Sequence, residues 1–304
     1  MDRENRQRSM SVAFAGLPNA GKSTLFNRIV GNRLSIVSPR EQTTRNVIRG
    51  VLTEGDSQLI FVDTPGIFRP KKNRILERMI VRNAWRGIGD VDLLCLILDS
   101  TEEMGEKLIG TIENIRTRRE DLVFLLNKVD LVKKERLLEM AKKLADICPG
   151  FRDIFMLSAR SGENVDKFRK YLLALAPERP WLFGEDEMTD APAKFMATEI
   201  TREKLFLSLE EELPYSLEVV SDSFEYSSSG AIRIHQTIVV LKESQRAIVV
   251  GRAGLALKNV GILARKDMER LFGRKVHLFL FVKVRPDWIE EKFHSKSQDL
   301  SENR

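Results

Sequence analysis

The run Gly16–Ser23 fits the spacing G-x-x-x-x-G-K-[ST]. Glycines at both ends of such a loop let main-chain N–H groups converge on phosphate oxygens. Lys22 offers a positive charge to the outer phosphates, and the hydroxyl of Ser23 is placed to bind Mg²⁺. An apolar strand pattern precedes the loop and a helical pattern follows it, so the helix N-terminus adds a favourable dipole. This context predicts a site for a nucleoside triphosphate, and it makes a chance glycine turn a poor alternative.

Two further segments supply groups for a metal and for the terminal phosphate. Asp63 opens the sequence "DTPG" after a strand pattern and is expected to hold Mg²⁺ through water, while the N–H of Gly66 is expected to contact the terminal phosphate. Thr44, which we favour over Thr43, lies in a polar loop where a threonine completes the metal shell when a γ-phosphate is present. The expected magnesium ligands are therefore Ser23, Thr44 and Asp63.

Two more segments select the base. In "NKVD" the carboxylate of Asp130 can accept hydrogen bonds from guanine N1–H and N2–H₂, whereas adenine has no donor at either point. Asn127 is expected to bond the base and the glycine loop, and the stem of Lys128 to cover the ring. The N–H of Ala159, in "SAR", is expected to donate to guanine O6. The full set of expected GTP contacts is Gly16, Leu17, Pro18, Asn19, Ala20, Gly21, Lys22, Ser23, Thr24, Asp63, Thr64, Pro65, Gly66, Ile67, Asn127, Lys128, Val129, Asp130, Ser158 and Ala159.

These segments belong to an alternation of strand and helix patterns between residues 11 and 177. Near-continuous apolar runs such as "DLLCLILD" and "DLVFLLN" are typical of strands buried on both faces. "VIRGVLTE" and "QLIFVDTPG" flank a Gly-Asp turn and predict a hairpin. The order predicts a doubly wound α/β domain, in which ligands bind at the carboxyl ends of the strands, where each motif falls.

A different order follows a proline-containing, acidic linker at 178–194. A helix over 194–213, two strands, a short segment, a GxxG loop, a helix over 255–272 and a closing strand predict a small α+β domain at 195–292. In "AIRIHQTIVVLK" the isoleucines alternate with Arg233, His235 and Thr237, which places the two sets on opposite faces of a strand. Residues 1–10 and 293–304 are assigned to terminal tails.

The second glycine loop, Gly251–Gly254, has three interpretations. It is a helix-opening turn without a ligand, a second nucleotide site, or a KH-type clamp that grips the backbone of a single nucleic-acid strand. A nucleotide site is disfavoured because no Lys-Ser/Thr pair follows the second glycine. Between residues 251 and 285 basic residues outnumber acidic ones by nine to two, so the chain's net charge of +6 is concentrated here, which favours the clamp.

The clamp interpretation assigns roles to the loop and to the helix after it. The expected RNA contacts are Gly251, Arg252, Ala253, Gly254 and Lys258. An apolar groove floor is expected from Leu255, Ala256 and Val260, and a core-facing stripe from Leu257, Ala264 and Met268.

The set "GLPNAGKST", "QTTR", "DTPG", "NKVD" and "SAR" resembles the Era/EngA/TrmE group of translation-factor-like GTPases. With "KFMATEITREKL", "VHLFLFVKV" and the element order of the second half, nearly the whole chain is similar to the Era family. The resemblance implies a P-loop GTPase domain followed by a type II KH domain. It also implies binding near the 3′ end of small-subunit ribosomal RNA during subunit assembly, with GTP hydrolysis switching RNA binding. Separately, we expect a monomer. Many KH loops carry lysine or arginine at one or both middle positions, and here Arg252 is basic whereas Ala253 is not.

The catalytic groups differ from those of Ras-like GTPases. Ile67 stands where those proteins carry a glutamine that orients the attacking water, so slow intrinsic turnover is expected. Lys22, Asn19 and Gly66 are the expected catalytic residues. The resemblance also motivates the hypothesis that Asn19 helps to ligate K⁺ beside the phosphates; a loop-shaping role is the alternative. A GTP sensor that does not hydrolyse its ligand is a further possibility.

The composition narrows the class of protein. Two cysteines form no disulfide framework, and no apolar run reaches the ~18–20 residues of a membrane-spanning helix. The first ten residues are charged and do not form a signal peptide. We therefore expect a cytoplasmic protein with at most a peripheral contact at the inner membrane. The alternative function is a GTP-controlled switch whose C-terminal domain docks on a protein or membrane surface, for which "RPDWIEEKFHSK" is a candidate contact.

Overall fold

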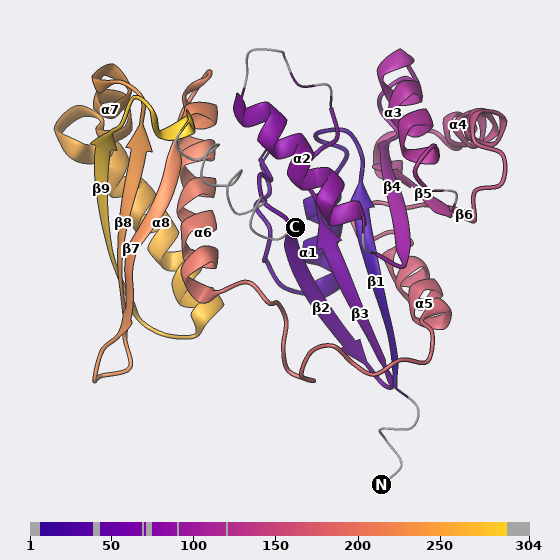
Figure 1. Ribbon diagram of the computed structural model, residues 1–304, viewed down its shortest axis with the longest axis horizontal. Helices are drawn as coiled ribbons and strands as arrows, with labels where there is room; N and C mark the ends of the chain where they lie inside the picture. The colour runs from indigo at the N-terminus through magenta and orange to yellow at the C-terminus, as the bar shows by residue number, and fades with distance from the viewer. Residues whose placement is uncertain are drawn as a thin grey trace, which may run out of the picture. The chain divides into compact units, whose positions relative to one another are not determined.

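The computed structural model describes residues 7–38, 43–68, 70, 75–89, 91–119 and 121–290. Most of both expected tails and residues 39–42 of the polar loop before Thr43 lie outside these ranges. The chain divides into two compact units, the first ending at Asp190 and the second running from Ala191 (Figure 1). Each unit has its own sheet and its own hydrophobic core.

The first unit is built on a six-stranded sheet with the order β2-β3-β1-β4-β5-β6. Only β2 runs antiparallel to its neighbour, and it pairs with β3 in the predicted hairpin across the turn at Gly55 and Asp56. The strands are β1 Arg8–Ala15, β2 Ile48–Glu54, β3 Ser57–Asp63, β4 Leu93–Asp99, β5 Leu122–Asn127 and β6 Asp153–Met156.

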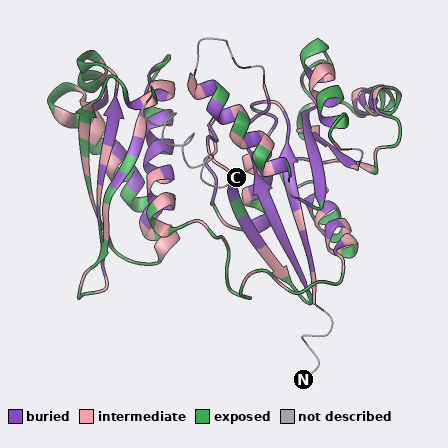
Figure 2. Cartoon of the chain, in the orientation of Figure 1, coloured by how far each residue is buried: buried purple, intermediate pink, exposed green. Residues whose placement is uncertain are grey.

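Helices cover both faces of this sheet, with α2 in front of the strands and α1 behind them in Figure 1. Successive residues of β1 point to opposite faces of the sheet. Ala13 and Ala15 pack with residues of α2, α3 and α4, while Phe14, between them, stacks on Phe61 with ring centroids 5.5 Å apart. The strands β1, β3, β4 and β5 are buried over most or all of their length (Figure 2), and the predicted doubly wound α/β fold is confirmed. The helices are α1 Lys22–Val30, α2 Ile75–Gly89, α3 Glu106–Arg116, the 3₁₀ turn η2 Val129–Leu131, α4 Lys134–Ile147 and α5 Val165–Leu175.

The expected linker is hydrogen-bonded to the first unit over much of its length. The buried side chain of Gln58 accepts from the N–H groups of Leu182 and Phe183, both at 3.0 Å, and donates to the Phe183 carbonyl at 2.9 Å. The N–H of Val51 donates to the carbonyl of Met188 at 2.8 Å. Residues 182–188 therefore lie along β2 and β3.

The second unit is a three-stranded sheet, β7-β8-β9, in which β7 pairs antiparallel and β9 parallel with β8. Buried residues of α8 and the isoleucines of β8 form its core, so this unit is the predicted α+β domain. Its elements are α6 Ala193–Ser208, η3 Leu213–Ser216, β7 Glu218–Tyr226, β8 Ile232–Val240, α7 Glu243–Val250, η4 Arg252–Gly254, α8 Leu255–Phe272 and β9 Val276–Val284.

The first helix of this unit is shorter than predicted. We expected it to reach residue 213, but α6 ends at Ser208 because Leu209 takes an extended conformation, with φ −101° and ψ 154°. Pro214, which cannot continue a helix, lies in the next turn. Within the described ranges no single helix is long and apolar enough to cross a bilayer. Taken together, α7 and residues 252–272 have the length and composition of a membrane span, but the two segments are bent by 42° relative to each other.

Candidate functional site

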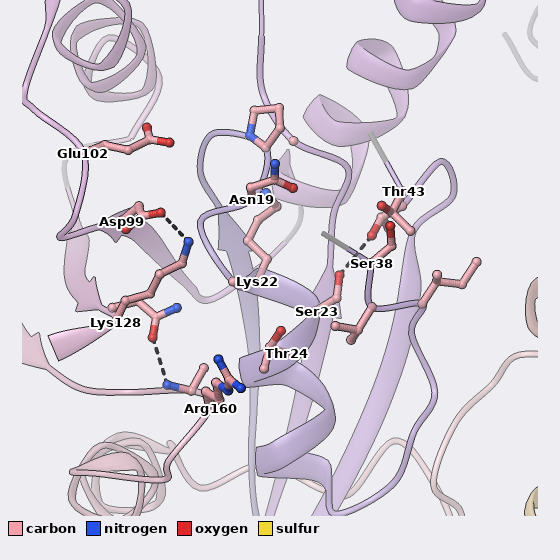
Figure 3. A pocket seen from close by; sticks show the side chains of 18 of the residues that line it. Asn19, Lys22, Ser23, Thr24, Ser38, Thr43, Asp99, Glu102, Lys128 and Arg160 are labelled. Atoms are coloured by element: carbon pink, nitrogen blue, oxygen red, sulfur yellow. Dashed lines mark hydrogen bonds and ion pairs between the residues drawn. The ribbon is translucent and has the colours of Figure 1, made fainter. Parts of the chain in front are cut away.

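A cavity of about 670 Å³ lies among the loops at the carboxyl ends of the strands in the first unit (Figure 3). The residues of the expected GTP set that line it are Pro18, Asn19, Gly21, Lys22, Ser23, Thr24, Gly66, Asn127, Lys128, Asp130 and Ala159, with Thr44 beside them. The other members of that set, which do not line it, are Gly16, Leu17, Ala20, Asp63, Thr64, Pro65, Ile67, Val129 and Ser158. Several of these support the lining residues from behind, as the contacts below show.

The glycines of the first loop are required by close approaches. A Cβ on Gly16, whose φ is +147°, would lie 2.4 Å from the carbonyl oxygen of Ile97 in β4. A Cβ on Gly21, at φ +96°, would lie 2.1 Å from the side-chain nitrogen of Asn127. Asn19 takes the left-handed conformation at φ +62°, which asparagine tolerates better than most residues. The loop is therefore held tightly between β4 and the end of β5.

Lys22 is the buried cation of the cavity. Its ammonium donates to the main-chain carbonyls of Gly16 and Leu17, at 3.2 and 2.8 Å. Burial lowers the pKa of Lys22 to about 8, although the negative charge of Asp63 acts in the opposite direction. Phosphate oxygens would be stronger acceptors for this ammonium than the neutral carbonyls that it now contacts.

The expected metal ligands converge on one point. Ser23 Oγ lies 3.0 Å from Thr44 Oγ1 and donates to Asp63 Oδ2 at 2.7 Å. Asp63 is buried, burial raises its pKa, and among the described atoms its Oδ1 has no hydrogen-bond partner. A buried carboxylate with one free oxygen beside two hydroxyls fits Mg²⁺, which prefers hard oxygen ligands. Thr44 contacts this set, while Thr43 lines the cavity.

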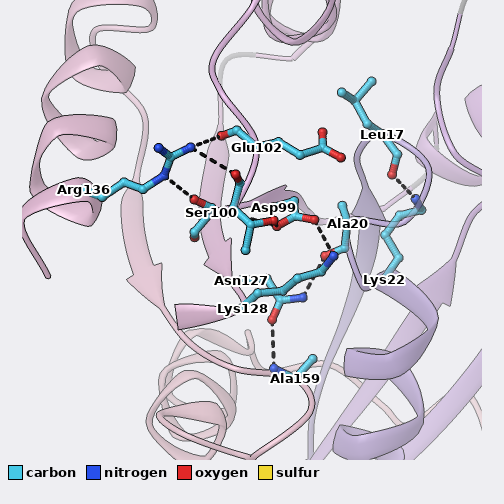
Figure 4. A network of polar contacts seen from close by, with 11 residues as sticks. Leu17, Ala20, Lys22, Asp99, Ser100, Glu102, Asn127, Lys128, Arg136 and Ala159 are labelled. Carbon is cyan, nitrogen blue, oxygen red and sulfur yellow. Dashed lines mark hydrogen bonds and ion pairs between the residues drawn. The ribbon is translucent and has the colours of Figure 1, made fainter. Parts of the chain in front are cut away.

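Asn127 joins three loops at the guanine end of the cavity. Its Nδ2 donates to the Ala20 carbonyl at 2.7 Å, and its Oδ1 accepts from the Ala159 N–H at 2.8 Å (Figure 4). The expected link between "NKVD" and the glycine loop is thus a direct contact. The N–H of Ala159 is already engaged, so guanine O6 would have to share that donor with Asn127.

A second polar network at this end was not predicted from the sequence. Lys128 forms an ion pair with Asp99 at the end of β4. The guanidinium of Arg136, in α4, donates to the carbonyls of residues 100, 101 and 102 at 2.7, 3.2 and 2.9 Å (Figure 4). Arg136 therefore fixes the loop that carries Asp99, and Asp99 in turn orients the lysine expected to cover the base.

Two other supporting residues were also missed. Ser35 donates to Asp63 Oδ2 at 2.6 Å, and Arg28 in α1 donates to the Ala159 carbonyl at 2.5 Å. A lone serine in a loop and a lone arginine on an amphipathic helix carry no motif. Ser35 lies 28 residues from Asp63 along the chain and Arg28 lies 131 residues from Ala159, so neither contact could be predicted from neighbouring residues.

Ile67 takes no part in orienting water through its side chain. The side chain is buried and packs in the core of the first unit, and its N–H donates to the Gly16 carbonyl at 3.0 Å. A Cβ on the neighbouring Gly66 would come within 3.0 Å of Pro18. The loop after β3 thus lies directly against the glycine loop, with Gly66 at the cavity wall.

The second glycine loop has three residues at positive φ, of which only Ala253 is not a glycine. Gly251, Ala253 and Gly254 have φ values of +72°, +51° and +75°. A Cβ on Gly251 would lie 2.5 Å from the Cβ of Ala256, whereas nothing lies within 4 Å of one on Gly254. Gly251 is therefore needed for a close approach, and Gly254 for its backbone conformation alone.

A groove of about 450 Å³ runs beside this loop, lined by Gly254, Leu257, Lys258, Gly261, Ile262, Arg265, Leu278 and Leu280. One expectation is wrong, because Val260 is a core residue with 2% of its surface exposed and not part of the groove floor. Leu257 packs against the core, as expected, and also lines the groove. The cause is helical geometry, because 257, 261 and 265 form one stripe of α8 while 260, 264 and 268 form the buried one.

The remaining expectations for the second loop are met in part. Leu255 is 57% exposed, and neither it nor Ala256 lines the groove. Of the expected RNA contacts, Gly254 and Lys258 line it, while the other three, Gly251, Arg252 and Ala253, lie in the adjoining loop.

Comparison with known proteins assigns a family model to each unit. A model described as a 50S ribosome-binding GTPase matches residues 11–128, and a KH domain model matches residues 212–289.

Whole-chain relatives extend over both units. GTPase Era of Afipia carboxidovorans is 45% identical over 280 residues, covering 92% of this chain and 90% of the relative. GTPase Era of Rickettsia conorii is 44% identical, covering 93% and 83%. A crystal structure of Era with MgGDPNP and nucleotides 1506–1542 of 16S ribosomal RNA matches with a TM-score of 0.88 and 34% identity, covering 93% of this chain and 95% of that one. A variant of Aquifex aeolicus Era bound to GDP·AlF4⁻ matches with the same TM-score and identity, covering 93% and 96%.

Proposed function

The chain belongs to the Era family of GTPases, and on that premise we propose that it hydrolyses GTP to GDP and phosphate and binds small-subunit ribosomal RNA through its KH domain. The observation that carries the first part is the meeting of Lys22, the Ser23–Thr44–Asp63 set and Asn127 around one cavity. The observation that carries the second is the largely apolar groove beside Gly254, which has Lys258 and Arg265 in its lining.

The residues divide the work of holding GTP. The ammonium of Lys22 exchanges two carbonyl partners for phosphate oxygens, and the N–H of Gly66 faces the terminal phosphate. Asp130 accepts from the guanine edge, Asn127 keeps the base loop against the glycine loop, and Lys128 covers the ring. Ser23, Thr44 and Asp63 would hold Mg²⁺, which when bound offsets the negative charge of the phosphates.

We expect GTP hydrolysis to be slow unless a group other than the Ile67 side chain orients the attacking water. Water must be oriented by main-chain groups at the cavity wall, by a rearrangement of the loop that carries Thr44, or by a partner. Asn19, also at that wall, is the residue proposed to ligate K⁺.

For the RNA we propose a site near the 3′ end of the small-subunit ribosomal RNA, because the related Era was crystallised with nucleotides 1506–1542 of 16S ribosomal RNA. GTP would order the loop at Thr44 and so control whether RNA is bound, and hydrolysis would reset the switch. The protein acts in assembly of the small ribosomal subunit. It does so in the cytoplasm, as a monomer. A peripheral membrane contact stays a prediction.

Two variants test the proposal. Gly254→Asp places a negative charge at the clamp and should weaken binding of a 3′-end ribosomal RNA oligonucleotide by more than about tenfold. Binding of the same oligonucleotide to the wild type should fall steeply as the salt concentration rises. GTP hydrolysis should be unchanged. Lys22→Ala should abolish GTP binding, and its affinity for the oligonucleotide should no longer change when GTP is added. If Gly254→Asp binds the oligonucleotide as tightly as the wild type, the clamp assignment is wrong.

A further inference from the structure

The sheet of the second unit has two faces of different character. Buried residues of α6, α7 and α8 pack with the isoleucines of β8 on one face. The opposite face, called here the outer face, carries the alternate residues of β8 and β9. In register, Arg233 lies opposite His277, His235 opposite Phe279, Thr237 opposite Phe281 and Val239 opposite Lys283.

Three aromatic rings lie together at the centre of this outer face. The ring of His235 stacks on Phe279, with ring centroids 4.6 Å apart and an interplanar angle of 17°. Its centroid lies 6.2 Å from that of Phe281, with an interplanar angle of 9°. Phe279 is 44% exposed and Phe281 is 54% exposed. Neighbouring exposed phenylalanines cost a protein solubility and usually mark a binding surface.

The charges around the rings favour a polyanion. Arg233 and His277 are exposed at one end of the aromatic group, and Lys283 is exposed at the other. Within the part of the chain that the structure describes, neither Arg233 nor Lys283 takes part in an ion pair, so both charges are available. Aromatic rings on an exposed sheet with cations beside them are typical of surfaces on which the bases of single-stranded RNA stack.

The outer face is also continuous with the groove beside Gly254. Strand β9 is at the edge of the sheet, and its Leu278 and Leu280 line the groove. The residues that alternate with them, Phe279 and Phe281, point to the outer face. A nucleic-acid strand that leaves the groove over the edge of β9 therefore meets these two rings next.

We propose that the outer face of β8 and β9 is a second contact for the same single-stranded RNA. Bases beyond those held in the groove stack on His235, Phe279 and Phe281, and their phosphates lie near Arg233 and Lys283. The proposal rests on the RNA binding proposed above and extends it from a clamp of about four nucleotides to a longer stretch.

Oligonucleotide length separates the two contacts. Binding of a pentanucleotide and of a dodecanucleotide from the 3′ end of small-subunit ribosomal RNA is measured for the full-length protein and for the double variant Phe279→Thr, Phe281→Thr. Threonine suits an exposed strand position, which protects the fold. The dodecanucleotide should bind the variant roughly 5- to 100-fold more weakly, as expected for lost base stacking. Pentanucleotide affinity should be unchanged.

Two further variants sharpen this test. Phe279→Trp keeps a stacking ring and should preserve dodecanucleotide affinity. Val220→Thr removes an exposed apolar side chain from β7, 45% exposed on the same sheet, and should change nothing. Equal dodecanucleotide affinity for the wild type and the double variant would overturn the proposal and leave the face to a protein partner. Equal weakening of both lengths would also overturn it, because the substitutions would then act on the groove. If the wild type binds neither oligonucleotide, the proposed RNA binding itself fails.

Discussion

The side chain of Asn127 donates a hydrogen bond to the main-chain carbonyl of Ala20 across 2.7 Å, and so ties the end of β5 to the glycine loop. The same side chain accepts from the N–H of Ala159 at 2.8 Å. Both partners are buried, and a side chain on Gly21 would displace the amide. One amide thus sets the spacing between the phosphate end and the base end of the site.

Replacing Asn127 should loosen both ends at once. Asn127→Ala leaves a buried carbonyl and a buried N–H without partners, a loss of about 1–3 kcal/mol. GDP and GTP affinity should both fall, by roughly 10- to 100-fold, in a fluorescent-nucleotide titration. Asn114→Ala, at an exposed position of α3, is the matched control and should bind as the wild type does. Unchanged nucleotide affinity in Asn127→Ala would contradict the bridging role.

Arg136 should affect nucleotide affinity without touching the nucleotide. Arg136→Ala frees the loop at residues 100–102 and should weaken GDP binding roughly three- to tenfold, because Asp99 no longer orients Lys128. The exposed Lys142 of the same helix supplies the control, Lys142→Ala. In a double-mutant cycle with Asp99→Ala, the two losses should be less than additive. Strict additivity would show that Arg136 acts by another route.

The residues that the sequence predicts well are those whose role is local. Gly16, Gly21, Lys22 and Ser23 lie within eight positions of one another, and their spacing alone places them around a phosphate. The supporting residues are different in kind. Arg136 contacts a loop 34–36 residues away, and its type and helical position are those of an ordinary surface arginine. Only the packing of α4 on the sheet brings it there.

The second unit shows the same limit in a helix. Both bounds of α8 follow from its glycines, Gly254 before it and Gly273 after it, each in the left-handed conformation. The roles of Leu257 and Val260 do not follow, because two apolar residues three apart lie on one side of a helix and periodicity does not say which edge of that side faces the sheet. The neighbouring strand β9, through Leu278 and Leu280, decides it.

The lowered pKa of Lys22 should make nucleotide binding depend on pH. In the free protein its pKa is about 8, and phosphates favour the charged form, so the bound state holds more protons and affinity falls as pH rises through 8. Calorimetric titration of GDP at pH 8 in buffers of different ionisation enthalpy, with Mg²⁺ chelated so that Asp63 does not contribute, should show uptake of about half a proton. Lys22→Arg, which stays charged, should show none. Absence of uptake in the wild type would contradict the assignment.

The potassium hypothesis for Asn19 can be tested with a conformationally matched variant. GTP hydrolysis in KCl should be faster than in NaCl at equal ionic strength if the Asn19 carboxamide ligates K⁺. Asn19→Gly accepts the left-handed backbone at φ +62° and removes only the side chain, so it should abolish the difference between the two salts. Equal wild-type rates in KCl and NaCl would refute the hypothesis. A difference that survives in Asn19→Gly would assign the ion to other ligands.

The two glycines of the second loop should respond differently to alanine. Both substitutions place a side chain at positive φ, which costs roughly 1–2 kcal/mol. Gly251→Ala adds a collision, since its Cβ would lie 2.5 Å from that of Ala256 and 3.0 Å from the Ala256 nitrogen. Its thermal midpoint should therefore fall further, and its RNA affinity with it, because the start of α8 must shift.

Gly254→Ala meets no neighbour and should bind RNA nearly as the wild type does, whereas Gly254→Asp should lose affinity through its charge, most of all at low salt. Equal RNA affinity in the alanine and aspartate variants of Gly254 would mean that no phosphate lies at this end of the loop.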